Sequence, residues 1–245
     1  MKFILALSIM FAAFTSCATS SVSKPTNTQN YLAMAPESIV KGADGYPDHW
    51  WKEVPKDQLA GWEISPHMAN RAAKEVILSK RNELGKLSNF EPAEFTLDGL
   101  TFASIEGLWQ ALKYPEGAND DRLKDPSVVW PYTREQVMKM SAFEAKKAGE
   151  LASANMKKLG VKWVTYRGEK IEYGGADKMK HYEIILRASR AKVAAHPAIK
   201  NILMQTGDLK LLPDHKSSPD YPPAYHYYDI YMKIRSEYQT STVNK

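Results

Sequence analysis

Apolar and polar positions alternate along parts of the chain with a period of two, which predicts strands. The apolar run at residues 76–78 indicates a short buried strand. In residues 93–104 the alternation continues on both sides of the Asp-Gly pair at 98–99, a common turn between antiparallel strands. Residues 161–175 repeat this pattern around an Arg-Gly pair. We therefore predict two hairpins and one further strand.

Longer stretches carry apolar residues at helical spacing. Ser104, followed within one turn by a glutamate, predicts the start of a helix. Residues 126–160 predict one helix or two, and residues 177–207 predict a helical stretch that is interrupted at a His-Pro pair. Residues 230–238 predict a closing amphipathic helix. The fold class that follows is α+β, a helix-rich single domain with a small antiparallel sheet over residues 46–240.

The beginning of the chain has the pattern of an export signal. An early lysine precedes an apolar run of roughly a dozen residues, too short to span a bilayer, so we predict a signal peptide at 1–16. The only cysteine, Cys17, ends the tetrapeptide FTSC, which resembles a bacterial lipoprotein box. We expect Cys17 to be lipidated, although a plain signal peptide cleaved nearby is the alternative.

The residues after this cysteine suggest where the protein resides. Residues 17–45 are rich in Ser, Thr, Asn and Pro, which is typical of a flexible tether. Acyl chains on Cys17 would hold the protein at a membrane surface without a spanning helix. Because Ala18 follows the cysteine, we expect an exported cell-envelope lipoprotein on the outer membrane, facing the periplasm.

Composition and charge exclude several classes of function. Hydrophobic residues at 44% and charged residues at 25% are typical of a soluble globular domain. The net charge of +5 is spread along the chain without a basic run, so duplex nucleic acid is not an expected partner. The sequence contains no phosphate-binding glycine loop, no dinucleotide motif and no zinc-ligand spacing. We therefore expect no metal and no cofactor.

Several residues of chemically useful types are assigned to structure instead. Trp50, Trp51 and Trp62 lie in an aromatic, proline-punctuated lead-in and are expected in the core rather than at a ligand. His196 and His215 are expected in loops or at the surface.

One predicted helix carries a polar face that suits a nucleotide. Glu106, Gln110 and Lys113 are spaced i, i+4 and i+7, and Trp109 lies on the same side. A carboxylate, an amide, a cation and a large ring are the groups that a phosphorylated, ribose-containing ligand requires. The same spacing also fits a salt-bridged helix face with Trp109 in the core, and Glu106 alone fits an acid that complements the helix dipole. Spacing leaves both interpretations open.

Residues 79–117 resemble the NADAR family, which includes the bacterial and plant riboflavin-intermediate N-glycosidases. The matching pieces are the LSNF loop, the LDGLTFAS hairpin and a helix with Glu, Gln and Lys at the family's spacing. The resemblance continues through residues 145–149, 188–208 and 211–215. It implies an enzyme that cleaves the bond between a ribose C1′ and a nitrogen.

The resemblance and the helix face together suggest a role for each candidate residue. Glu106 is the implied acid/base, and Lys80 would contact the leaving group or attack C1′ of a ring-opened sugar to form a Schiff base. Hydroxyls of the ribose would be held by polar side chains, a ring would stack on the base, and a second acid would come from the late loop. The implied substrate-binding residues are Ser88, Asn89, Phe90, Trp109, Gln110, Lys113, Asp214 and Asp220.

The chain departs from the family pattern at three places. Gly107 stands where histidine is common, the tryptophan expected near 175–177 is missing, and residues 221–224 replace a Trp-Gly-Asp-Gly element. These departures concern the identity of the substrate more than the fold. The expected partner is a small nucleotide-like molecule, a ribosylamino-pyrimidine or an ADP-ribose adduct, and the expected function is an N-glycosidase. The alternative is a non-catalytic nucleotide- or ADP-ribose-binding envelope lipoprotein.

Overall fold

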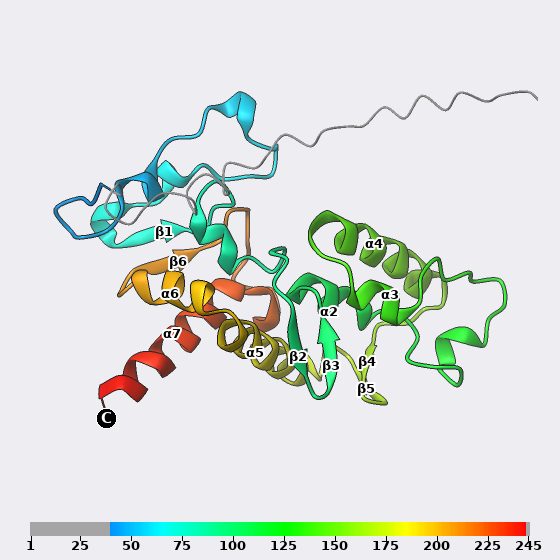
Figure 1. Cartoon of the computed structure of the whole chain (residues 1–245). Helices are drawn as coiled ribbons and strands as arrows, with labels where there is room; N and C mark the ends of the chain where they lie inside the picture. The colour runs from blue at the N-terminus through cyan, green and yellow to red at the C-terminus, as the bar shows by residue number, and fades with distance from the viewer. Residues whose placement is uncertain (1–39, 244–245) are drawn as a thin grey trace, which may run out of the picture.

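The computed structural model describes residues 40–243, in which strands form three separate two-stranded sheets (Figure 1). Two pairs are antiparallel hairpins, as predicted, and the third pair is parallel. The strands are β1 (Glu75–Ile77) with β6 (Lys210–Leu212), β2 (Phe95–Leu97) with β3 (Leu100–Phe102), and β4 (Val164–Tyr166) with β5 (Glu169–Ile171). The parallel pairing of β1 with β6 was not predicted, because β6 lies in a segment without clear alternation.

Helices contain many more of the described residues than strands do, which confirms a helix-rich α+β fold. The α-helices of the described residues are α2 (Ile105–Ala111), α3 (Arg134–Met138), α4 (Ala142–Lys158), α5 (Lys178–Ala195), α6 (Pro197–Gln205) and α7 (Tyr227–Val243). Short 3-10 helices fill several connections, among them η6 (Glu83–Leu87) and η8 (Pro223–Tyr225). The break between α5 and α6 falls at His196, as predicted, because Pro197 has no N–H with which to continue the helix.

Both hairpins turn on two residues with positive φ. Asp98 and Gly99 have φ of 51° and 80°, and Arg167 and Gly168 have φ of 53° and 79°. This left-handed pair is the geometry that matches the twist of the two strands in a tight hairpin. The Tyr166 hydroxyl donates a hydrogen bond of 2.8 Å to Asp98, so the hairpins are joined at their turns.

The N-terminus of α2 is held by a buried serine. The Oγ of Ser104 accepts a hydrogen bond of 2.8 Å from the backbone N–H of Gly107 and donates one of 3.1 Å to the carbonyl of Met140. This confirms the predicted helix start. All seven residues of α2 are buried, and the helix packs against α3, α4 and α5. The helix is therefore enclosed by neighbours rather than stable on its own.

The C-terminal end of α2 is held by two buried guanidinium groups. Arg122 donates hydrogen bonds to the carbonyls of Leu112 and Lys113 at 3.1 and 2.8 Å. Arg134 donates one of 2.6 Å to the carbonyl of Tyr114. Burial lowers the pKa of Arg134 to about 10. These bonds satisfy carbonyls that the helix end leaves without intrahelical partners.

The predicted signal peptide at 1–16, Cys17 and most of the predicted tether at 17–45 lie outside the described residues. In the part of the chain that the structure describes, none of the helices has the length and apolar character needed to cross a membrane.

The two serines at helix N-caps give a matched test of the anchoring of α2. Ser104→Ala removes a buried cap and leaves the N–H of Gly107 and the carbonyl of Met140 unpaired, so the free energy of unfolding should fall by about 2 kcal/mol. Ser141→Ala at α4 removes a serine whose side chain makes no capping bond, so it should cost less than half as much. Urea denaturation measures both, and equal losses would contradict the proposed role of Ser104.

Candidate active site

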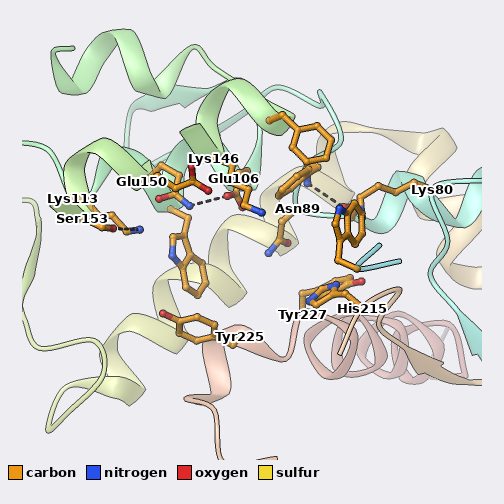
Figure 2. A pocket seen from close by; sticks show the side chains of 16 residues that line it. Lys80, Asn89, Glu106, Lys113, Lys146, Glu150, Ser153, His215, Tyr225 and Tyr227 are labelled. Carbon is orange, nitrogen blue, oxygen red and sulfur yellow. Dashed lines mark hydrogen bonds between the residues drawn. The ribbon is translucent and has the colours of Figure 1, made fainter. Parts of the chain in front are cut away.

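A cavity of about 590 Å³ is lined by residues of α2, of α4 and of the loops that follow β1 and β6. Eight of the residues selected from the sequence line it: Lys80, Ser88, Asn89, Phe90, Glu106, Trp109, Gln110 and Lys113. In Figure 2, Glu106 and Lys113 lie on one side of the cavity, Lys80 lies on the other, and Asn89 lies between them. The structure thus brings residues from two segments into one site.

Glu106 is a carboxylic acid held in a poorly solvated position. Its side chain lies in the cavity wall, and the residue is only 8% exposed. Its Oε1 accepts a hydrogen bond of 2.7 Å from the amide nitrogen of Gln110. Burial raises the pKa of Glu106, while this hydrogen bond and the charges of Lys113, Lys146 and Lys80 oppose the rise without cancelling it. A raised pKa suits a group that must give and take a proton near neutral pH.

Two glycines allow α2 to lie this close to α4. A Cβ on Gly149 would lie 1.7 Å from the Oε1 of Gln110, so any side chain there would displace that amide. A Cβ on Gly107 would lie 2.4 Å from the backbone carbonyl of Met140. The second contact gives a physical reason for the departure at Gly107, since a histidine would not fit unless the backbone near Met140 moved.

The Ser-Asn-Phe loop is tied to α2 and to α5. The carbonyl of Asn89 accepts a hydrogen bond of 2.9 Å from the backbone N–H of Glu106. From α5, the fully buried Lys192 donates a hydrogen bond of 2.8 Å to the carbonyl of Ser88. Ser88 Oγ accepts one of 3.1 Å from the N–H of Phe90. The loop therefore holds its side chains at a defined position relative to Glu106.

Two side-chain amides at the cavity have unused hydrogen-bonding capacity. The Oδ1 of Asn89 and the Oε1 of Gln110 are buried without a hydrogen-bond partner among residues 40–243. Leaving a buried acceptor unpaired is costly in a folded protein. Both oxygens are buried, so the ribose-binding role predicted for these amides requires them to rotate toward the cavity.

Lys80 enters the cavity from the loop after β1 and is paired with Asp214. The amine forms an ion pair with Asp214, which is fully buried and follows β6. His215 donates a hydrogen bond of 2.9 Å to the other carboxylate oxygen of Asp214. Burial raises the pKa of Asp214, but His215 and Lys80 together outweigh it and hold the pKa below its ordinary value. The carboxylate thus stays ionised and keeps the amine in place.

Trp109 and Lys113 belong to the opposite wall. The Trp109 ring is 8% exposed and meets Tyr225 edge to face, with ring centroids 4.8 Å apart. Behind it lies the buried His181 ring, 4.5 Å away, whose pKa is lowered to about 4 by burial and by Lys113. Lys113 donates a hydrogen bond of 3.0 Å to Ser153, and burial lowers its pKa too. This wall offers a flat ring beside a cation.

The two late acids selected from the sequence have different positions. Asp214 contacts Lys80 but does not itself line the cavity. Asp220 is exposed and is not brought to the cavity; its N–H donates to Ser218 within its own loop. Of the two, only Asp214 is therefore placed to act on the site, and it does so through Lys80.

Sequence reasoning missed several residues that line the cavity. Trp62 was assigned to the core together with Trp50 and Trp51; Trp50 is fully buried and Trp51 partly buried, but Trp62 is 42% exposed and lines the cavity. His215, expected in a loop or at the surface, lies in the loop after β6 and also lines the cavity. The other missed residues are Phe143, Lys146, Glu150, Ser153, Tyr225 and Tyr227. The i, i+4, i+7 spacing of 146, 150 and 153 on α4 is a signal that could have found three of them.

No cluster of three or more His, Cys, Asp or Glu side chains that could hold a metal ion occurs within residues 40–243. The cavity residues are instead suited to an organic ligand, with rings at both ends and amides, cations and one buried acid between them.

Comparisons with known proteins add little to this geometry. No protein-family model matches the chain, and no curated protein matches it. Among solved structures, the NMR structure of the E. coli protein YbiA is similar, with a TM-score of 0.44 and 17% sequence identity. The match covers 68% of this chain and 85% of that chain. A likeness this distant carries no functional argument.

The buried carboxyl of Glu106 should make stability depend on pH. Its folded pKa is raised, so its contribution to stability is complete below the ordinary value of 4.5 and is lost as pH rises through the folded pKa. The side chain at position 106 cannot ionise in Glu106→Gln. The melting temperature of this variant should therefore exceed that of wild type by a margin that grows from pH 4 to pH 8. Each kcal/mol of difference in the free energy of unfolding corresponds to about 2–4 °C. Thermal unfolding across this range measures it. Glu144→Gln, the same change on an exposed residue of α4, is the control, and a margin that stays constant or shrinks would contradict the buried state of Glu106.

Proposed function

We propose that this protein is an N-glycosidase that hydrolyses the bond between the ribose C1′ and a nitrogen of a ribosylated or ADP-ribosylated base. The observation that carries the proposal is that a buried carboxyl, Glu106, and an amine, Lys80, line one cavity together with the amides of Asn89 and Gln110. The sequence resemblance to the NADAR family supports the same reaction.

The reaction needs one group that moves a proton at C1′. The C1′–N bond breaks with its electron pair going to the nitrogen, positive charge builds on C1′ and the ring oxygen, and the oxygen of a water molecule bonds to C1′. Glu106 takes a proton from that water and returns one to the leaving nitrogen, so the atoms balance. The raised pKa of its carboxyl fits this exchange, and its negative form stabilises the charge on the sugar.

Lys80 acts in this scheme as a hydrogen-bond donor. Its amine is ion-paired with the buried Asp214, which fixes its position at the cavity wall. The ammonium group donates to an oxygen of the leaving base or to a phosphate. Attack of this amine on C1′ of a ring-opened sugar, with formation of a Schiff base, is the alternative role.

The remaining residues position the ligand. Asn89 and Gln110 line the cavity and bind ribose hydroxyls through their amide groups, and Ser88 shapes the loop beside them. The Trp109 ring contacts the base, and the cations of Lys113 and Lys146 attract a phosphate. Asp214 contributes by orienting Lys80.

Replacing the acid without changing its shape tests the reaction. Glu106→Gln should lower the rate of base release by about 100-fold or more, because it removes the proton transfer and keeps the hydrogen bond from Gln110. The purified protein is incubated with ribosylamino-pyrimidines, NAD or ADP-ribosylated guanine, and mass spectrometry measures the free base that is released. Glu144→Gln is the control variant. If wild type releases no base from any of them yet binds ADP-ribose, the chain is a binding module and the enzyme proposal fails.

Export and lipid anchoring form a second part of the proposal. The apolar run before FTSC and the position of the only cysteine support a lipidated Cys17 and an address in the cell envelope. An exported enzyme would meet substrates released into the envelope rather than the main cytoplasmic pool.

Metabolic labelling tests the anchor directly. The full chain expressed in a bacterial host with a clickable palmitate analogue should carry the label and sediment with membranes, and Cys17→Ser should lose both properties. If the wild-type chain is exported but carries no label, residues 1–16 act as a plain signal peptide and the lipid anchor is ruled out.

A further inference from the structure

The mouth of the cavity carries a cluster of three aromatic rings, which we call the aromatic mouth: Trp62, Phe90 and Phe143. Phe90 and Phe143 meet edge to face with centroids 5.2 Å apart, and Trp62 lies 6.4 Å from Phe143. The amine of Lys80 lies 5.2 Å from the Trp62 ring and 5.4 Å from the Phe90 ring. A cationic group thus lies next to the cluster and faces the same cavity.

Large apolar side chains that are exposed to solvent and clustered at a cavity often mark a binding surface. Trp62 and Phe143 are 42% and 56% exposed. Of the large hydrophobic side chains that are exposed within residues 40–243, those that line the cavity are all aromatic: Trp62, Phe143 and Tyr225. Flat rings concentrated at the opening indicate a surface for another flat ring.

Trp62 comes from outside the part of the sequence that resembles the NADAR family. The segment that carries it is nevertheless fixed to the site. Glu63 forms an ion pair with Arg81, and Arg81 also donates 2.7 Å to the carbonyl of Gln58. The N–H of Ile64 donates 2.8 Å to the carbonyl of Asp214. The Trp62 segment is therefore attached to both loops that hold the Lys80–Asp214 pair.

Phe143 is presented by an unusual backbone. Ala142, the first residue of α4, has φ of 49°, a left-handed conformation that non-glycine residues seldom adopt. Strain of this kind persists where the surrounding structure enforces it, and it gathers at ligand sites. Ala142 directly precedes Phe143, whose ring meets Phe90 and remains largely exposed instead of entering the core.

We propose that the aromatic mouth is a second ring-binding subsite, in which Trp62 and Phe143 are specificity-determining residues that stack on a planar ring carried by the substrate beyond the cleaved ribose. Lys80 meets an anionic group beside that ring. The inference rests on the proposed function for the position of the ribose near Glu106. The aromatic mouth would favour a ligand in which an aromatic nucleoside is joined through phosphate to the cleaved ribose. A ligand that consists of a single phosphorylated sugar would lack this contact.

Binding, rather than turnover, tests this subsite. ADP-ribose and ribose 5-phosphate differ by the adenosine and one phosphate, and calorimetry with the purified protein measures both. Trp62→Ala and Phe143→Ala should each weaken the affinity for ADP-ribose by about 5- to 100-fold, the range expected when a base loses one stacking ring. The affinity of both variants for ribose 5-phosphate should stay within twofold of wild type. Trp62→Phe and Phe143→Tyr should recover most of the affinity.

Two exposed apolar residues outside the cavity provide controls. Met68→Ala, in the same N-terminal part of the chain, and Leu151→Ala, on α4, should leave ADP-ribose binding unchanged. The subsite proposal would be overturned if wild type bound ADP-ribose and ribose 5-phosphate with equal affinity. It would also be overturned if the alanine variants lost affinity for both ligands to the same extent. Because no bond is cleaved in this assay, loss of activity in Glu106→Gln and loss of ring selectivity in Trp62→Ala are separate results.

Discussion

The site depends on the burial of one short helix that carries polar side chains. All seven residues of α2 are buried, Glu106 and Gln110 included, and a helix of this length has little stability of its own. The Ser104 cap at one end and the guanidinium groups on the carbonyls at the other hold it in place. Removing Glu106 from water costs stability, and the same removal raises its pKa, so the chemistry and its cost have one origin.

Features with a local cause were predictable from the sequence. The turns at Asp98 and Arg167 follow from glycine at the next position, and the start of α2 follows from the hydroxyl of Ser104. The break before Pro197 follows from its missing N–H. On the site, Glu106 and Gln110 were recognisable because a helix places side chains four residues apart on one face, and they are hydrogen-bonded to each other.

Features with a distant cause were not predictable in this way. The pairing of β1 with β6 joins segments whose short apolar runs do not specify a partner. Trp62 is of a residue type that is common in cores, and its position at the cavity depends on a long-range contact, the ion pair of its neighbour Glu63 with Arg81. Asp220 shows the opposite case, an acid whose selection rested on resemblance alone and which is exposed and does not line the cavity.

The parallel strand pair also has a consequence for the order in which the site is built. Lys80 follows β1 and Asp214 follows β6, so the ion pair between them closes a loop of 134 residues. Contacts of such long sequence separation form slowly, since chain entropy must be lost before they stabilise anything. During synthesis α2 and its cap emerge well before β6. The wall of the cavity that holds the Lys80–Asp214 pair can therefore be completed only after β6 has been synthesised, later than the segment that supplies Glu106.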